Sequence, residues 1–386
     1  MTRVPVCSSL TTSCVVSPSG ERQTTWRITR WRSWRPERCA WSSTRRSASP
    51  PPMACGGLRT TCFRGYVRCR AEGGRMTMVA KLAPEARQLL SRMPARPPRR
   101  AGSVEEARAG LRAAADAVFG PIEPLARVID LQVKGRVVIP VRLYHPEPGA
   151  VLPAVVYAHG GGWVMGDLET HDRLCRALAS ASGCAVIAVD YRRAPEHPFP
   201  AAWQDVQDVL RDAAANPVAF GIDPARIALA GDSAGGQLAA ATALWARDAG
   251  IAVRHVILLM PDVDNHPEQW ASHDEFDERY GLYPDDQVWY YEQYFGLSWR
   301  SGEGAGVSPL RADLAGLAPT TIVLAECDPV HDEGAAFAQR LREALVPVEV
   351  LDYPGMFHPF ILFRGLEATR RAEREVTDAL RRHLVD

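Results

Sequence analysis

Two glycine-rich segments, each directly after an apolar run, constrain this chain more than any other feature. HGGGW at residues 159–163 follows apolar residues 155–158, and GDSAGG at residues 231–236 follows apolar residues 227–230. The second segment has the G-x-S-x-G pattern, which places a serine on a sharp turn between a strand and a helix. Glycines after the other strand leave backbone N–H groups free to bind a developing oxyanion. Together the segments predict that Ser233 is a nucleophile beside amide donors.

A serine hydroxyl is a weak nucleophile, so a base must accept its proton. His358 is the best candidate, because it lies in a loop directly after the strand-like residues 348–351. Loops at the carboxyl ends of parallel strands are where such folds place functional groups. His383, by contrast, lies among arginines in the last predicted helix, and we expect it on a solvated face.

The base needs a carboxylate that orients it, and this acid should also follow a strand. Residues 321–325 are the most strand-like run in the second half of the chain, and Asp328 lies just after them. We therefore favour Asp328 as the acid. Glu326 and Asp332 are alternatives within a few residues, although Asp332 is also placed to cap a helix that begins near residue 333.

Over a longer stretch, the chain resembles the bacterial hormone-sensitive-lipase-like esterases, in the subgroup that has an aspartate before the nucleophile. The matching segments follow the family's order over residues 130–365, and a fainter likeness extends from about residue 76 to 385. They are HGGGW (159–163), DYRRAPEHPFPAAW (190–203), GDSAGG (231–236), CDPVHDEG (327–334) and PGMFHPF (354–360).

The resemblance implies a catalytic triad and an oxyanion hole. The triad would consist of Ser233, Asp328 and His358. The oxyanion hole would consist of the backbone N–H groups of Gly160, Gly161 and Ala234. Three residues depart from the family pattern without removing a reacting group: Arg193, Val330 and Pro359. Pro359 directly follows the expected base, so it could alter fine specificity.

Several other polar residues have a structural interpretation. We expect His159 to orient the glycine loop, the Glu196–His197 pair to fix a loop between prolines, and Asp232 to make structural hydrogen bonds. A dinucleotide-binding loop is not expected, because Met165 stands where the G-x-G-x-x-G pattern needs its third glycine. No set of cysteines and histidines has zinc spacing, so we expect neither a metal nor another cofactor.

Charge is distributed unevenly along the 386 residues, whose formal net charge is zero. Residues 1–75 carry fourteen arginines, no lysine and three acidic residues, together with six of the nine cysteines. Their apolar residues follow no sustained period, so this segment cannot build a core. We expect residues 1–75 to be a disordered basic extension and an artefact, read as protein from a start codon placed too early. A basic arm that binds nucleic acid and an organellar targeting peptide are alternatives.

From residue 76 onward, strand-like and helical segments alternate. Residues 126–133 and 136–144 flank a hairpin-like turn. Further strands are expected at 153–159, 185–191, 226–231, 255–260, 321–325 and 348–351, with helices at 170–182, 201–215 and 233–248. Helices of this length between strands indicate an α/β fold, with a mostly parallel eight-stranded sheet covered on both faces. The resemblance implies that this is the α/β-hydrolase fold with a helical cap.

Residues 262–305 interrupt the alternation with an acidic, aromatic-rich insertion. An insertion at the carboxyl edge of the sheet can cover the serine and supply a substrate pocket. A pair of surface helices with an aromatic core is the alternative. In the resembling family the cap combines N-terminal helices with such an insertion, so we assign residues 76–125 and 262–305 to the cap of a domain that spans 76–386.

Cysteine content and hydropathy bear on the compartment and the partners. Beyond residue 75 the chain has three cysteines, Cys175, Cys184 and Cys327, which fits a reducing cytoplasm and no disulfide framework. No run of eighteen apolar residues occurs, so no membrane span is expected. We expect a small-molecule ester as the partner and no nucleic acid, and we leave a homodimer open.

The expected reaction is the hydrolysis of a carboxylic ester through an acyl-enzyme on Ser233. The resemblance implies esters with short or medium acyl chains. Two alternatives are a non-catalytic small-ligand receptor on the same fold and a hydrolase of amides, carbamates or lactones. The resembling family includes a receptor that has lost the catalytic histidine, so the presence of His358 argues against the receptor.

Overall fold

The computed structural model describes residues 13–16, 22–25, 58–63, 66–71, 81–93, 97–277 and 280–385. The chain divides into two units, residues 1–72 and residues 73–386. The first unit contains two antiparallel strand pairs, β1 (Ser13–Val16) with β2 (Arg22–Thr25) and β3 (Leu58–Phe63) with β4 (Tyr66–Ala71). Most of residues 1–75 lies outside the described residues, so the interpretation as a disordered, artefactual extension stays a prediction.

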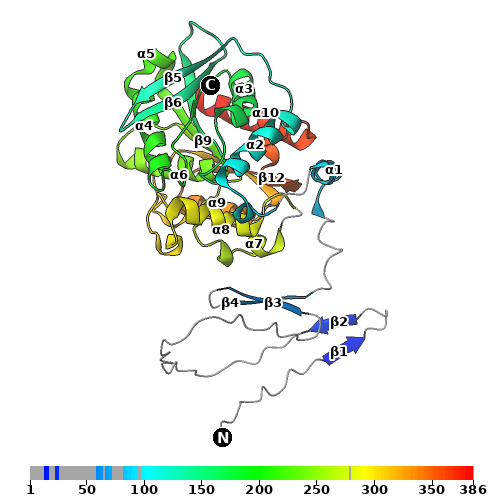
Figure 1. Ribbon diagram of the computed structural model, residues 1–386. Helices are drawn as coiled ribbons and strands as arrows, with labels where there is room; N and C mark the ends of the chain where they lie inside the picture. Colours follow the sequence, from blue (N-terminus) through cyan, green and yellow to red (C-terminus); the bar gives the residue numbers. More distant parts are fainter. Residues whose placement is uncertain are drawn as a thin grey trace. The chain divides into compact units, whose positions relative to one another are not determined.

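An eight-stranded sheet organises the second unit (Figure 1). Its strands are β5 (Arg127–Lys134), β6 (Val138–His145), β7 (Leu152–Ala158), β8 (Ala185–Val189), β9 (Ile222–Asp232), β10 (His255–Leu259), β11 (Thr320–Cys327) and β12 (Val348–Phe357). They are ordered β12-β11-β10-β9-β7-β8-β6-β5 across the sheet. The pairings from β12 to β8 are parallel, whereas β6 is antiparallel to both of its neighbours. The predicted mostly parallel sheet and its hairpin are confirmed.

Helices cover both faces of this sheet. One face is covered by α3 (Leu168–Ser182) and α10 (Glu367–Leu384), and the other by α4 (Ala201–Ala215), α6 (Ala234–Asp248) and α9 (His331–Glu343). Successive residues of β7 alternate between the two cores: Val155 and Tyr157 join the first, and Val156 and Ala158 join the second. This alternation is what a strand buried on both faces requires.

Two groups of helices lie outside the alternation of strands and helices along the chain. The first contains α1 (Pro84–Arg92), η2 (Arg99–Ala101) and α2 (Val104–Val118). The second lies between β10 and β11 and contains η3 (Pro267–Gln269), α7 (Ala271–Glu275), α8 (Pro284–Phe295), η5 (Trp299–Ser301) and η6 (Pro309–Arg311) (yellow in Figure 1). Two further short helices are α5 (Pro217–Phe220) and η7 (Phe360–Leu362). No helix in the described part of the chain has both the length and the apolar character needed to cross a membrane.

Local sequence signals set the beginnings of two helices near the site. Ser103 and Glu106 form a reciprocal capping box that begins α2. Asp167 and Thr170 do the same for α3. Gly183 then ends α3 in the left-handed conformation, with φ 74°, which glycine adopts at little steric cost. These caps hold the ends of two helices that lie close to the glycine loop of residues 159–163.

Two local expectations differ from the structure. β12 runs on to Phe357, because Tyr353 pairs with Ala325 and, after a register shift, Phe357 pairs with Cys327. The Pro–Gly step inside this strand hides the continuation from sequence patterning, because both residues usually end a strand. The prediction that Asp332 caps a helix is wrong. α9 begins at His331, so Asp332 lies inside the helix, and no side chain caps its first turn.

Candidate active site

Ser233 lies on the turn between β9 and α6 with φ 53° and ψ −122°, a conformation that serine rarely adopts. Such backbone strain costs about 1–3 kcal/mol and persists only where the surroundings hold it. The Ser233 N–H donates to the Leu259 carbonyl at the end of β10 (2.8 Å). A Cβ at Gly235 would lie 2.1 Å from the Ala158 carbonyl oxygen, so the turn closes only with glycine there. This is the geometry of a nucleophile elbow.

Three side chains from distant parts of the sequence meet beside this turn. His358 Nε2 lies 2.9 Å from Ser233 Oγ, and His358 Nδ1 lies 2.7 Å from Asp328 Oδ2. Asp328 follows β11 and His358 follows β12, so both come from the carboxyl ends of neighbouring parallel strands. Asp328 Oδ1 also accepts the Val330 N–H (3.0 Å), which fixes the carboxylate. The structure therefore brings together the residues expected as nucleophile, base and acid.

The two alternative acids bind other partners. Glu326 accepts the N–H of Gly355 (2.8 Å), and Asp332 accepts the N–H of Ser272 (3.0 Å). Among the described residues, neither carboxylate bonds to His358. Of the three candidate acids, Asp328 alone is in place to orient the imidazole.

Asp328 also sets the proton affinity of His358. Burial lowers the pKa of His358, but the charge and hydrogen bond of Asp328 raise it by more, so the pKa lies above the usual 6.5. Asp232 and Asp262 add to the increase. An imidazole with a raised pKa is a stronger base toward the Ser233 hydroxyl.

The glycine loop after β7 presents its N–H groups unequally. The Gly160 N–H, expected as an oxyanion donor, instead donates to Asp232 Oδ1 (2.9 Å) and is therefore engaged. Gly161 and Gly162 follow with φ 115° and 63°, conformations that favour glycine, and both line the cavity above Ser233. The Ala234 N–H opens α6, where the first helical N–H groups have no partner within the helix. The donors left for a ligand are therefore those of Gly161, Gly162 and Ala234.

Asp232 is a fully buried anchor for the glycine loop. Besides Gly160, it accepts the Tyr157 hydroxyl (2.6 Å) and lies 3.3 Å from His171 Nε2. Burial favours the neutral acid, but the charge and hydrogen bond of His171 and the Tyr157 bond outweigh it, so the pKa of Asp232 is lowered. The prediction that Asp232 makes structural hydrogen bonds is confirmed.

His159 is held as a neutral side chain beneath the same loop. Its Nδ1 contacts the Gly160 carbonyl oxygen (2.8 Å), and its ring stacks on Tyr191 at 4.1 Å between centroids. Burial, and then the neighbouring His171, lower the pKa of His159 to about 3. The expected orienting role is confirmed, because this imidazole braces the loop and does not reach Ser233.

Arg108 of α2 ties the first group of helices to the loops around the site. Its guanidinium binds both carboxylate oxygens of Glu196 (2.7 and 2.8 Å) and donates to the carbonyls of Val164 (2.8 Å) and Ala194 (3.0 Å). Glu196 therefore fixes a loop, as predicted. One of these bonds joins α2 to Val164, just after the glycine loop, and the other three join it to the loop that follows β8.

A cavity of about 720 Å³ opens above Ser233 and His358. Its apolar wall comes from both helix groups outside the sheet alternation: Leu90, Met93, Leu111, Ala114, Val118, Leu282 and Tyr290. The Tyr290 ring packs against the loop so closely that a Cβ at Gly162 would lie 2.3 Å from it. The volume suits a small organic molecule.

Two polar residues of the cavity wall were not predicted from the sequence. Asp262, just after β10, accepts the Tyr291 hydroxyl (2.7 Å) and the Gln287 amide Nε2 (3.2 Å). Burial raises the pKa of Asp262. An acidic residue shortly after a strand is the same signal that pointed to Asp328. The same criterion, applied to the strand that ends near residue 260, could have identified Asp262 in the sequence. Gln287 lies in a tyrosine-rich helix and gives no such signal.

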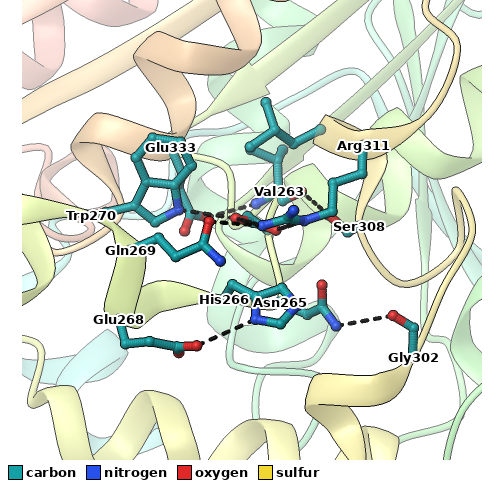
Figure 2. Close-up of polar contacts among 12 residues, drawn as sticks. Val263, Asn265, His266, Glu268, Gln269, Trp270, Gly302, Ser308, Arg311 and Glu333 are labelled. Carbon is teal, nitrogen blue, oxygen red and sulfur yellow. Dashed lines mark hydrogen bonds and ion pairs between the residues drawn. The ribbon is translucent and has the colours of Figure 1, made fainter. Parts of the chain in front are cut away.

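The segment after β10 is fixed by its neighbours. Figure 2 shows the Val263 N–H donating to Glu333 Oε1 (2.7 Å), the Ser308 hydroxyl bonding to the Val263 carbonyl (3.2 Å) and the Asn265 amide bonding to the Gly302 carbonyl (3.2 Å). Asp262 directly precedes this network, and its own N–H donates to the Ser233 carbonyl oxygen (3.2 Å), so its backbone is fixed from both sides. Within the described ranges, no group of three or more His, Cys, Asp or Glu residues is arranged to hold a metal ion.

Comparisons with known proteins agree with this geometry. A family model described as the alpha/beta hydrolase fold matches residues 155–362. A carboxylic ester hydrolase of Mycobacterium tuberculosis is 38% identical over 288 residues, which cover 72% of this chain and 76% of the relative. An ethyl acetate hydrolase of Pseudomonas putida is 35% identical over 296 residues, covering 74% of this chain and 92% of the relative.

Solved structures show the same likeness. An esterase of Pyrobaculum calidifontis superposes with a TM-score of 0.74 at 38% identity, covering 79% of this chain and 100% of that chain. A thermostable esterase of Pseudomonas putida superposes with a TM-score of 0.75 at 32% identity, covering 79% and 98%. Both the sequence and the fold are therefore similar to those of esterases.

Proposed function

The chain belongs to the alpha/beta-hydrolase-fold family of carboxylic ester hydrolases, and on that premise we propose that it cleaves esters through an acyl-enzyme on Ser233. The observation that carries the proposal is the pair of contacts at His358, 2.9 Å to Ser233 Oγ and 2.7 Å to Asp328 Oδ2. Nucleophile, base and acid in this order are the parts that acyl transfer needs.

In the first step, His358 Nε2 accepts the Ser233 proton as Oγ attacks the ester carbonyl carbon. Asp328 stabilises the imidazolium that forms and keeps Nδ1 protonated. The C–O bond to the alcohol then breaks, and the alcohol leaves with the proton from His358. Water repeats the sequence on the acyl-enzyme, which releases the acid and restores Ser233.

The oxyanion that forms during each attack needs amide donors. We assign this role to the N–H groups of Gly161, Gly162 and Ala234. Gly162 takes the place expected for Gly160, because the Gly160 N–H donates to Asp232. Each donor lowers the barrier by about 3 kcal/mol.

The proposed substrates are esters with short or medium acyl chains. We propose that residues 76–125 and 262–305 form a cap over the serine, which is supported by cavity-lining residues from α1, α2 and α8. Residues 76–80, 94–96 and 278–279 of these segments lie outside the described residues. Walls from two sides limit the size of the acyl and alcohol groups that enter.

Replacing the nucleophile tests the proposal. We expect Ser233→Ala to lower kcat/KM for p-nitrophenyl butyrate by at least about a thousandfold, because the remaining groups cannot form an acyl-enzyme. Ser301→Ala, in η5, is the matched control and should retain full activity. An unchanged rate in correctly folded Ser233→Ala, judged by circular dichroism, would refute the assignment.

A fluorophosphonate probe separates the esterase from a receptor on the same fold. An activated serine reacts covalently with the phosphorus centre, whereas a serine in a binding pocket does not. We expect the intact protein to be labelled and Ser233→Ala to remain unlabelled, as read by mass spectrometry.

We propose a cytoplasmic location for the enzyme. Cys175, Cys184 and Cys327 are buried free thiols, which fits a reducing compartment. We propose a small-molecule ester as its partner and no nucleic acid, and sedimentation of the purified protein distinguishes a monomer from the homodimer left open.

A further inference from the structure

We propose that Arg99 forms an anion subsite at the rim of the cavity, which selects esters that carry a carboxylate at the end remote from the ester bond. The inference rests on the proposed esterase function and deepens it by naming a class of substrate.

The guanidinium of Arg99 has no partner in the described part of the chain. Arg99 begins η2 and is half-buried. Its backbone N–H donates to Asp286 Oδ1 (2.6 Å), which holds the residue in place, but its side chain makes no hydrogen bond or ion pair there. Nε is closed off from solvent, whereas Nη1 and Nη2 are not. The end of the guanidinium is therefore open to a ligand.

This open end lies in the cavity wall. Arg99 and Gly110 of α2 both line the cavity that contains Ser233. A Cβ at Gly110 would lie 3.9 Å from Arg99 Nη1, so the guanidinium lies beside the wall that α2 provides. The neighbouring cavity-lining residues Pro98 and Gly102 are exposed, so this part of the wall is the rim.

An apolar row leads away from the guanidinium along α2. Gly110, Ala114 and Val118 are spaced four residues apart, so they lie on one face of the helix, and all three line the cavity. Eight residues of helix extend for about 12 Å. A substrate with its ester bond at Ser233 can lay a methylene chain against this row and present a charged end to Arg99.

The charges at the rim suit a carboxylate better than a phosphate. Among the cavity-lining residues that are exposed or half-buried, the charged ones are Arg92, Arg99 and Glu106. Two arginines against one glutamate leave a single positive charge, which one carboxylate neutralises. A phosphate group carries about two negative charges near neutral pH and would also be repelled by Glu106.

The shape of the open group fits a carboxylate as well. The two terminal nitrogens of a guanidinium donate parallel hydrogen bonds to the two oxygens of a carboxylate, and such charge-assisted pairs are stronger than neutral ones. The bond from the Arg99 N–H to Asp286 fixes the backbone of the subsite before a substrate arrives, which reduces the entropy lost on binding.

Pairs of esters that differ only in a carboxylate in place of a primary amide test the subsite. On the acyl side, the monoethyl esters of glutaric, adipic and suberic acid are compared with the same esters whose free carboxyl is an amide. On the alcohol side, the butyrate ester of 4-hydroxybutanoic acid is compared with that of 4-hydroxybutanamide. Hydrolysis is followed by titration of the released acid. The readout is the ratio of kcat/KM, carboxylate over amide, on one enzyme preparation, so the fraction of folded protein cancels.

We expect Arg99→Gln to lower this ratio by about tenfold in at least one pair and to leave kcat/KM for the amide nearly unchanged. Arg99→Lys, which keeps the charge but loses the two-pronged donor, should give an intermediate ratio. Arg100→Gln is the matched control. It removes the same charge from the next residue of η2, whose guanidinium is paired with Glu292 (2.8 Å), and should leave the ratio unchanged.

The failures of the two proposals are distinguishable. If the intact enzyme hydrolyses the amide members but Arg99→Gln keeps the ratio in every pair, the subsite is refuted and the esterase stands. An equal fall of the ratio in Arg99→Gln and Arg100→Gln also refutes it, because that result indicates long-range charge and no contact with Arg99. If the intact enzyme hydrolyses no ester, p-nitrophenyl butyrate included, the proposed function itself is wrong.

Discussion

Two buried aspartates next to Ser233 differ in role because they have different partners. Asp328 bonds to His358 Nδ1 (2.7 Å), so its charge acts on the base. Asp232 bonds to the Gly160 N–H (2.9 Å), so its charge acts on the loop that carries the oxyanion donors. Both carboxylates are removed from water, and the hydrogen bonds they accept offset the cost of that burial.

The raised pKa of His358 predicts the pH dependence of the reaction. Only neutral imidazole can accept the serine proton, so activity should be lost as the pH falls through the pKa of His358. Because Asp328 raises that pKa above 6.5, the acidic limb of kcat/KM should have its midpoint above pH 6.5. A pH series with p-nitrophenyl butyrate measures it, and a midpoint below 6.5 would contradict the assignment.

Asp328→Asn tests the cause of the shift. Without the negative charge, burial should be the largest influence on the pKa of His358 and should lower it. The acidic limb of kcat/KM should then move to lower pH. The rate at the optimum should also fall by about a thousandfold or more, because the imidazolium loses its partner. Glu326→Gln is the matched control, since Glu326 bonds to the Gly355 N–H and should leave the limb in place.

Gly235 is the residue on which the elbow depends most directly. Its missing side chain leaves room for the Ala158 carbonyl oxygen, 2.1 Å from where a Cβ would stand. Gly235→Ala must displace backbone, so we expect a loss of about 3 kcal/mol in the free energy of unfolding and loss of activity. Gly365→Ala, where nothing lies within 4 Å of the added Cβ, should change neither in urea unfolding.

At the scale of elements, two arginines of α2 bond to the site loops: Arg108 makes most of these hydrogen bonds, and Arg112 adds one to Asp167 (2.7 Å). Arg108 makes hydrogen bonds to Glu196 and to two backbone carbonyls, all from loops between strands of the sheet. The side chains of Leu111, Ala114 and Val118 then line the cavity from the same helix. We therefore expect the position of this cavity wall to depend on the hydrogen bonds of the Arg108 guanidinium.

Arg108→Ala is expected to loosen α2 and to raise KM more than it lowers kcat. The substrate loses a fixed wall, whereas Ser233 and His358 stay in contact through other elements. A rise in KM of severalfold and a loss of about 1–2 kcal/mol in stability would fit. Arg382→Ala, which breaks an exposed pair with Glu349 on another face, should leave KM unchanged.

The sequence predicts the alternating elements well because each carries its own signal. The strand-like runs at 153–159 and 185–191 became β7 and β8 with small changes at their ends. The continuation of β12 across Pro354 and Gly355 could not be predicted, because it depends on pairing with β11. Strand order likewise comes from contacts between distant segments and from no local pattern.

The candidate site likewise contains residues that local sequence reveals and contacts that arise only on folding. Ser233, Asp328 and His358 follow apolar strands and carry reactive groups, so position and chemistry select them. That the Gly160 N–H is engaged could not be seen, because it depends on where Asp232 points after folding. Gln287 was missed for a similar reason: its hydrogen bonds to Asp262 and Tyr291 form only when α8 packs against the segment after β10.

At the scale of the whole molecule, the charge is split along the chain. Residues 1–75 carry fourteen arginines against three acidic residues, and residues 76–386 carry 42 acidic against 31 basic residues. All helices from α1 to α10 and every proposed site residue belong to the unit of residues 73–386. We therefore expect that the chemistry does not depend on the first unit.

A chain that begins at Met76 should fold and hydrolyse esters as the full chain does. Because every proposed site residue and all described residues of both cores lie beyond residue 75, we expect kcat/KM for p-nitrophenyl butyrate to agree within about twofold and Tm within about 3 °C. Opposite charges attract across solvent only at low ionic strength, so the comparison is made at about 0.01 M and about 1 M salt. If the shortened chain is inactive at both, residues 1–75 are part of the enzyme; if the two chains differ at low salt alone, the basic segment acts on the acidic unit through charge.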